Sequence, residues 1–189
     1  MPPLHPGSMP RPLRDTRAGI FHVFTHCVWA APGLFRDDLN RTVFLRELAR
    51  VTRTFEWTCI GFCLMGTHYH LMLEVPDGAL PAGMQSLNFR YAMDFNQRHG
   101  MRGHVQFARY GAVRITSDSH LQTVYRYVVR NPVEAQLCGN CEDWPWSSYA
   151  AAVGLAEPHS FVDPMRVLAS FDLVRELAAA QLRAFVEEL

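Results

Sequence analysis

Hydrophobic residues change their spacing several times along residues 1–130, and this alternation constrains the fold more than any other feature. Segments rich in β-branched and aromatic residues are typical of strands and cover residues 20–29, 55–65, 68–75 and 105–116. Segments with apolar residues at helical intervals cover residues 38–54, 80–99 and 117–130. The resulting order, β-α-β-β-α-β-α, predicts an α+β fold of the ferredoxin-like kind: a small antiparallel sheet with helices on one face.

Local sequence signals delimit several of these segments. Gly66-Thr67 separates two predicted strands by the two residues that a tight hairpin turn needs. An aspartate at 37 or 38 can cap the first helix. Pro132 is expected to end the third helix near Arg130, because the residue before a proline avoids helical geometry.

The length of the chain, 189 residues of which 49% are hydrophobic, suits one globular domain with a sizeable core. Residues 1–17 are rich in proline and arginine and lack apolar periodicity, so we expect a flexible basic arm. The main domain then spans residues 18–153. Residues 154–189 form a C-terminal helical tail, in which 171–189 is amphipathic.

The sequence carries no membrane or secretion signal that we can identify. No run approaches the roughly 18 consecutive apolar residues of a membrane span, and the proline-rich start lacks the apolar stretch of a signal peptide. The five cysteines are odd in number and scattered, which fits a reducing compartment better than a disulfide framework. We therefore expect a cytoplasmic protein.

Charge is distributed unevenly, although the net charge is zero. Residues 1–130 hold 15 Arg against 9 acidic residues, a balance of +6, and residues 131–189 hold 3 Arg against 9, a balance of −6. All 18 basic residues are arginine, which reflects either the codon usage of a GC-rich genome or a need to bind phosphate with two parallel hydrogen bonds. The basic part of the chain is where a nucleic acid would bind.

His68 and His70 form a His-x-His triplet at the start of a predicted strand. Side chains alternate along a strand, so both imidazoles point to the same face. Imidazole binds first-row divalent ions well, and a strand fixes the pair more rigidly than a loop would. Such triplets also arise by chance, so this signal is weak by itself. Glu74 shares the face and is either a further ligand or a carboxylate at the edge of the sheet.

Three other chemistries that use a His-x-His triplet fit the sequence less well. A histidine-triad hydrolase needs a third histidine where this chain has Met72. A two-histidine phosphoesterase needs two separate His-x-Thr/Ser motifs, which the chain lacks, and a cupin needs more short strands. A phosphate-binding glycine loop is also missing, so we expect no nucleotide cofactor.

Tyr127 lies in the third predicted helix, whose apolar stripe faces the core and consists of Leu121, Val124, Tyr125 and Val128. At roughly 100° per residue, Tyr127 is about 200° away from Tyr125 and projects away from that stripe. Asn131 follows one turn later on the same face. There a phenol and a carboxamide could meet one metal-bound phosphate, although an exposed tyrosine and a polar helix end would give the same pattern.

Other residues with reactive side chains fit a structural role better. Tyr91 and Tyr125 each fall on an apolar stripe, which disfavours them as nucleophiles. Cys138 and Cys141 form a lone C-x-x-C, which needs two further ligands to hold zinc. The remaining candidates for metal binding are expected to be structural or exposed: His22, His26, His99, His104 and His120.

Six blocks distributed over about residues 17–151 carry a family resemblance when they are taken together. They are Gly19-Ile-Phe-His-Val-Phe-Thr, Cys63-Leu-Met-Gly-Thr-His-Tyr-His-Leu-Met-Leu, Met84-Gln-Ser-Leu-Asn-Phe-Arg-Tyr-Ala-Met-Asp-Phe-Asn, Gly103-His-Val-Gln-Phe-Ala-Arg-Tyr, Tyr127-Val-Val-Arg-Asn-Pro-Val-Glu-Ala and Trp144-Pro-Trp-Ser-Ser-Tyr. In this order and spacing they resemble the REP-associated tyrosine transposases, single-tyrosine enzymes of the HUH superfamily that are related to the IS200-like transposases.

The resemblance implies the HUH nuclease fold, with His68 and His70 as metal ligands, Tyr127 as the nucleophile and Asn131 completing the metal site. It implies a single-stranded DNA endonuclease and strand transferase that uses Mg²⁺ or Mn²⁺, forms a 5′-phosphotyrosine and acts on hairpin or palindromic DNA as a monomer or homodimer. Two positions depart from the family pattern, Thr67 before the first histidine and Ala108 before Arg109.

Arginines in the basic part of the chain are candidate contacts to DNA phosphates: Arg17, Arg90, Arg109, Arg114 and Arg130. Taken singly, each of these arginines fits the role of a solvated surface residue better than that of a DNA contact. Two rival functions stay open at this point. One is a non-catalytic nucleic-acid-binding module of the same fold, and the other is a metal-dependent phosphodiesterase that uses water in place of the tyrosine.

Overall fold

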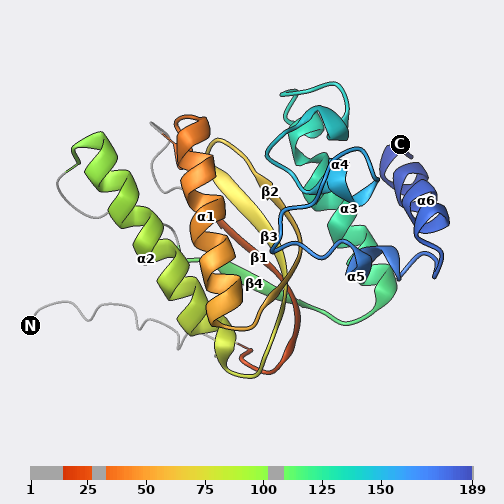
Figure 1. The fold of residues 1–189 in the computed structure, drawn as a ribbon, viewed down its shortest axis with the longest axis horizontal. Coiled ribbons are helices and arrows are strands. Elements are labelled where there is room, and N and C mark those ends of the chain that lie inside the picture. Colours follow the sequence, from red (N-terminus) through yellow and green to blue (C-terminus); the bar gives the residue numbers. More distant parts are fainter. Residues whose placement is uncertain (1–14, 27–32, 102–108, 189) are drawn as a thin grey trace, which may run out of the picture.

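The structure is a computed structural model and describes residues 15–26, 33–101 and 109–188. Within them, an antiparallel sheet has the strand order β2-β3-β1-β4 (Figure 1). The strands are β1 (Gly19–His26), β2 (Thr58–Leu64), β3 (His68–Val75) and β4 (Gly111–Ile115). The central pair, β1 and β3, comes from segments that are separated by a helix and a further strand.

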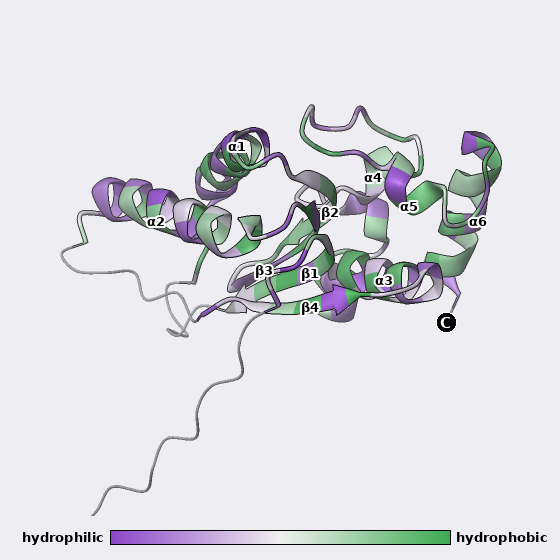
Figure 2. Ribbon diagram, turned by 90° about the horizontal axis from the view of Figure 1, so that it is seen from below, coloured by the Kyte–Doolittle hydropathy of each residue, from purple (hydrophilic) through white to green (hydrophobic). Residues whose placement is uncertain are grey.

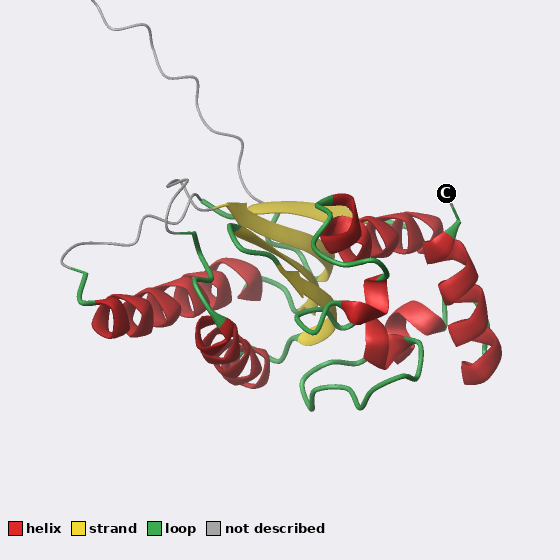
Figure 3. Ribbon diagram, turned by 90° about the horizontal axis from the view of Figure 1, so that it is seen from above, coloured by secondary structure: helices red, strands yellow, loops and turns green. Residues whose placement is uncertain are grey.

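Two long helices, α1 (Asp38–Thr54) and α2 (Ala79–His99), lie side by side on one face of the sheet (Figure 3). Helix α3 (Asp118–Glu134) packs on the other face with a set of shorter elements: a 3₁₀ turn (Cys141–Asp143), α4 (Tyr149–Ala152), α5 (Met165–Leu168) and α6 (Arg175–Glu187). The predicted α+β fold is confirmed, but the expectation that all helices share one face is wrong.

Burial on both faces of the sheet explains the two layers of helices. Along β3, Tyr69, Leu71 and Leu73 join the core under α1 and α2, whereas Met72 joins the core under α3. Figure 2 shows hydrophobic residues along the sheet between the two groups of helices. Because successive side chains of a strand point to opposite faces, a strand that is buried throughout needs a cover on each side.

The two long helices on one face end where local signals predict. Helix α1 spans residues 38–54 as predicted, since the Asp37 side chain accepts a hydrogen bond from the Asn40 backbone N–H. Helix α2 ends before Gly100, which adopts the left-handed conformation with φ 61°. The predicted ends of the first and fourth strands, residues 27–29 and 105–108, lie outside the described residues.

Helix α3 continues through Pro132 to Glu134, so the prediction that it stops near Arg130 is wrong. Pro132 is buried, and the last turn is closed by the Ala135 N–H on the Asn131 carbonyl and the Leu137 N–H on the Pro132 carbonyl. A proline removes its own N–H bond and crowds the carbonyl one turn earlier, and the helix continues for only two residues beyond it. Asn131 therefore keeps a helical position relative to Tyr127.

The C-terminal tail shares a core with α3. Ala178, Leu182 and Val186 of α6 are fully buried in the cluster that contains Leu121 and Tyr125. The Arg130 guanidinium also donates to the Val186 carbonyl at 2.7 Å. The tail thus stabilises the back of the helix that carries Tyr127. Among the described helices, none combines the length and the apolar character that crossing a membrane requires.

Candidate active site

The His-x-His pair lies at the start of β3 with both imidazoles on the face that α3 covers. The ring centroids of His68 and His70 are 5.2 Å apart, with the rings nearly perpendicular. The preceding turn is fixed from outside the hairpin, because the Gly66 carbonyl accepts hydrogen bonds from the backbone N–H groups of Leu34 and Phe35, both at 2.9 Å. The predicted common orientation of the two histidines follows from this strand geometry.

Each of the two histidines uses its Nδ1 atom in a contact with a neighbouring side chain. Thr67 Oγ1 lies 3.1 Å from Nδ1 of His68. His22 Nε2 lies 2.9 Å from Nδ1 of His70. Thr67 is one of the two residues that depart from the family pattern, and its hydroxyl supplies a polar contact to the first histidine.

His22 comes from β1, where it pairs with Met72 of β3 and shares the face of the His-x-His pair. Its side chain is buried, and its ring lies within 27° of parallel to that of His70, with the ring centroids 5.1 Å apart. Burial, with a smaller contribution from His120, lowers the pKa of His22 to about 4, so this imidazole is neutral at neutral pH. The sequence predicted only a structural or exposed role for His22.

Tyr127 projects from α3 towards these histidines. Its ring centroid lies 5.4 Å from that of His70 and 6.0 Å from that of His22, both in edge-on arrangements. The side chain is 48% exposed, so the ring is accessible while its edge contacts the histidines. This confirms the inference that Tyr127 projects away from the buried stripe of the helix.

The position of α3 depends on a close approach to β2. A Cβ atom added at Gly61 would lie 2.8 Å from the Tyr125 ring, closer than carbon atoms pack. Glycine at this position therefore lets the helix approach the sheet. Tyr125 faces this contact and is fully buried, and burial raises the pKa of its phenol. The absence of a side chain at Gly61 thus helps to bring Tyr127 to the histidines.

Asn131 lies one turn after Tyr127, as the helical spacing predicts. Its Nδ2 atom donates a hydrogen bond to the Tyr127 backbone carbonyl at 2.7 Å. The amide oxygen Oδ1, which is the atom that a divalent ion would use, takes no part in that bond. The structure therefore places Asn131 beside Tyr127.

The other tyrosines weighed as nucleophiles are held inside the protein. Tyr91 is fully buried, and its hydroxyl donates to the Leu34 carbonyl at 2.6 Å. Tyr125 is equally buried under the sheet. Neither phenol can reach a DNA phosphate without unfolding part of the core, so Tyr127 is the exposed candidate of the three.

The candidate DNA-binding arginines fall into two groups. Arg90 on α2 and Arg109 before β4 are exposed, and the Arg17 side chain is 78% exposed. Arg130 is held by the Val186 carbonyl and by Glu134, with 18% of its side chain exposed. Arg114 is likewise held by partners within the protein.

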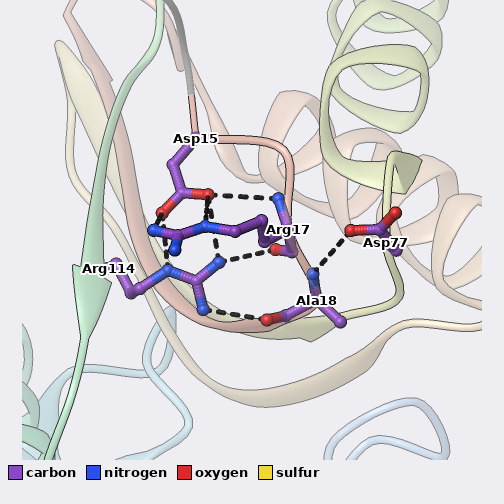
Figure 4. A network of polar contacts seen from close by, with 5 residues as sticks. All are labelled: Asp15, Arg17, Ala18, Asp77 and Arg114. Carbon is purple, nitrogen blue, oxygen red and sulfur yellow. Dashed lines mark hydrogen bonds and ion pairs between the residues drawn. The ribbon is translucent and has the colours of Figure 1, made fainter.

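Arg114 joins the start of the described chain to β4 (Figure 4). Its guanidinium donates to both carboxylate oxygens of Asp15 and to the backbone carbonyls of Arg17 and Ala18. The guanidinium groups of Arg17 and Arg114 hold the pKa of the Asp15 carboxyl well below its usual range. Because most donors of Arg114 are used here, its role is to fix residues 15–18. Residues 1–14 of the predicted arm lie outside the described residues.

The donors available for a metal ion are few. In the part of the chain that the structure describes, no three His, Cys, Asp or Glu side chains are grouped so that they could hold an ion. Cys138 and Cys141 belong to no such group within that part. Glu74 forms an ion pair with Arg166 at 3.3 Å.

The residues near Tyr127 nevertheless fit a divalent ion chemically. The imidazoles of His68 and His70 and the amide oxygen of Asn131 are donors that such ions accept, with phosphate and water completing the coordination shell.

Two comparisons with known proteins found matches to transposases. Residues 20–131 match the family described as "Transposase IS200 like". A solved structure described as "Structure of the REP associates tyrosine transposase bound to a REP hairpin" aligns with a TM-score of 0.66 and 15% sequence identity, covering 82% of this chain and 98% of that one. No curated protein sequence matches the chain.

The two matches carry different weight. At 15% identity the solved structure shows that the fold is shared. The family match covers more than half of the chain, begins in β1 and ends at Asn131, so it contains the histidines, Tyr127 and Asn131. The chain belongs to the family of IS200-like transposases.

Proposed function

We propose that the protein cleaves and rejoins single-stranded DNA through a covalent bond between Tyr127 and the DNA. The observation that carries this proposal is the 5.4 Å separation of the Tyr127 and His70 rings. It brings an exposed phenol from α3 next to an imidazole pair on β3. In a family of transposases, this neighbourhood is the expected setting for phosphodiester cleavage by a tyrosine.

His68, His70 and Asn131 would hold one divalent cation, Mg²⁺ or Mn²⁺, beside the phenol. When bound, such an ion withdraws electron density from a phosphate oxygen and offsets charge that develops during cleavage. The protein residues orient the reacting groups. The hairpin turn fixes the two imidazoles, and α3 fixes Tyr127 relative to Asn131. The metal and the ligand set are part of the proposal.

In the proposed reaction, the Tyr127 oxygen attacks the scissile phosphorus and loses its proton. A phosphotyrosine bond to the 5′ side forms as the bond to the 3′ oxygen breaks, and the released 3′ oxygen takes up a proton to become a hydroxyl. Attack by the 3′-hydroxyl of a second strand reverses these steps and joins the two ends. The phosphodiester energy is conserved, so the reaction needs no nucleotide cofactor.

Hairpin or palindromic DNA is the proposed substrate, and the DNA-bound state of the structurally similar transposase supports it. Arg90, Arg109 and Arg17 are the proposed phosphate contacts because their side chains are exposed. Phe89 is 62% exposed beside Arg90 and offers a face on which an unpaired base can stack. As an enzyme of chromosomal DNA it would act in the cytoplasm, as a monomer or homodimer.

The test is covalent capture of labelled single-stranded hairpins with Mn²⁺ or Mg²⁺, analysed on a denaturing protein gel. Wild type is expected to give a protein–DNA band, and Tyr127→Phe is expected to lose it. Tyr149→Phe is the matched control, since the buried Tyr149 hydroxyl makes no hydrogen bond in the described part of the chain, and it should keep the band.

Each rival function predicts a different result in this experiment. A non-catalytic binding module would retain the DNA without cutting it. A phosphodiesterase that uses water would cut the DNA without forming a covalent band, and Tyr127→Phe would still cut. Either pattern, across several hairpins and both metals, would contradict the tyrosine mechanism.

A further inference from the structure

A third imidazole, that of His22, contacts the His-x-His pair from the neighbouring strand. His22 Nε2 lies 2.9 Å from His70 Nδ1, which is a hydrogen-bond distance between two ring nitrogens. Both side chains are buried, with 8% of His22 and 3% of His70 exposed. Two ring nitrogens can form such a bond only if one carries a proton and the other offers a lone pair. One proton therefore lies between the rings, on either His22 Nε2 or His70 Nδ1.

The position of that proton decides what His70 can do with its second nitrogen. If His22 Nε2 carries the proton, His70 Nδ1 accepts it, and a neutral His70 then carries its own proton on Nε2. If His70 Nδ1 carries the proton and donates to His22, then Nε2 of His70 bears the lone pair that a metal ion binds. Only the second arrangement is compatible with metal binding through Nε2.

His68, the other histidine of the pair, also contacts a neighbouring side chain through Nδ1, which lies 3.1 Å from the Thr67 hydroxyl oxygen. Both members of the pair are therefore oriented through Nδ1, by groups that can each accept a hydrogen bond. Metal-binding histidines generally donate their second ring N–H to such an acceptor, which fixes the tautomer and the orientation of the ring.

We propose that His22 is a positioning residue that accepts a hydrogen bond from Nδ1 of His70 and thereby holds His70 in the tautomer that binds the metal through Nε2. This inference rests on the proposed metal site. It goes beyond it by giving a role to a residue on β1 that would bind neither the metal nor the DNA. The two rings lie within 27° of parallel with their centroids 5.1 Å apart, as expected for rings joined edge to edge by this hydrogen bond.

The experiment compares two substitutions of His22, of which only one retains a hydrogen-bond acceptor. His22→Gln keeps an acceptor, since its amide oxygen can take the position of Nε2, whereas His22→Leu keeps the bulk and removes the acceptor. His120→Leu is the matched control: His120 lies on α3 and makes only a minor electrostatic contribution to the low pKa of His22. Thermal unfolding of each metal-free variant establishes that it is folded.

Mn²⁺ affinity, measured by electron paramagnetic resonance without DNA, is the first readout. His22→Leu is expected to weaken Mn²⁺ binding by about 10- to 100-fold, the usual effect of losing such an orienting partner. His22→Gln should recover most of the loss, and His120→Leu should bind like wild type. Equal affinity of wild type and His22→Leu would overturn the proposal, and so would a His22→Gln variant as weak as His22→Leu.

Nitrogen NMR of the histidine rings, recorded with Mg²⁺ present, is the second readout and requires no activity. The proposal expects the His70 proton on Nδ1, and a proton on Nε2 would overturn it. The Mn²⁺ measurement also distinguishes a failure of this inference from a failure of the proposed function. If Mn²⁺ affinity depends on His22 but no DNA adduct forms, only the proposed DNA cleavage is contradicted. If wild type binds no Mn²⁺, the role of His22 is overturned.

Discussion

At the residue scale, the site combines positions that the sequence could predict with one that it could not. His68 and His70 share a face because they are two apart on a strand, and Tyr127 avoids the apolar stripe of its helix. These relations are local. His22 meets His70 only because β1 pairs with β3 in a register that sets His22 opposite Met72. A long helix separates the two strands, so no turn length reveals that register in the sequence.

A residue-scale prediction concerns Asp15, which binds the guanidinium groups of Arg17 and Arg114. Its folded-state pKa lies below the unfolded value of about 3.9, so the stabilisation is complete above that pH and declines as the pH falls further. We expect Asp15→Asn to lower the Tm modestly at pH 7, with a difference from wild type that narrows below about pH 4. Thermal unfolding from pH 7 to pH 2 measures this. A difference that grows on acidification would contradict it.

At the scale of elements, the sequence predicted those whose periodicity is long enough to recognise. Helix α1 and strand β3 have the predicted bounds, whereas α4 and α5 are too short for helical spacing to appear and were missed. The end of α3 was also missed, because the buried Pro132 is accommodated in the last turn. The tail helix was predicted at 171–189 and is observed as α6, but its packing against α3 depends on contacts that no periodicity reveals.

The packing of α6 on α3 gives an element-scale prediction. Leu182 is fully buried against α3, whereas Leu173 just before α6 is 92% exposed. Leu182→Ala should lower the free energy of unfolding by about 2–5 kcal/mol, because a cavity remains where the side chain was. Leu173→Ala makes the same chemical change at the surface and should stay within about 0.5 kcal/mol of wild type. Urea unfolding measures both, and equal effects would contradict the proposed anchoring of α3.

At the scale of the whole molecule, the sheet carries helices on both faces, and the site forms on the face of α3. The sequence contained a hint of this, since the Cys59–Leu64 part of β2 is almost continuously apolar, a pattern typical of a strand covered on both sides. The charge asymmetry between residues 1–130 and 131–189 is visible in the sequence, but only the structure separates exposed arginines from those held within the protein.

DNA-binding measurements test this distinction between exposed arginines and those held within the protein. Removing a phosphate contact should weaken hairpin binding and reduce the slope of log K against log salt by about 0.7–0.9. We expect this for Arg90→Ala and for Arg109→Ala. Arg175→Ala, an exposed arginine at the start of α6, is the matched control and should leave both quantities unchanged. Fluorescence anisotropy at several salt concentrations measures the slopes, and equal slopes in all variants would contradict the assignment.

The central claim is that Tyr127 becomes covalently attached to DNA. The most direct test is mass spectrometry of the wild-type adduct after nuclease and trypsin digestion. Cleavage after Arg126 and Arg130 releases residues 127–130, a peptide with one hydroxyl side chain, that of Tyr127. The account predicts a nucleotide phosphate on this peptide, or on one extended by a missed cleavage, with fragment ions that locate it on Tyr127. A nucleotide on any other residue, or cleaved DNA without a modified peptide, would contradict the claim.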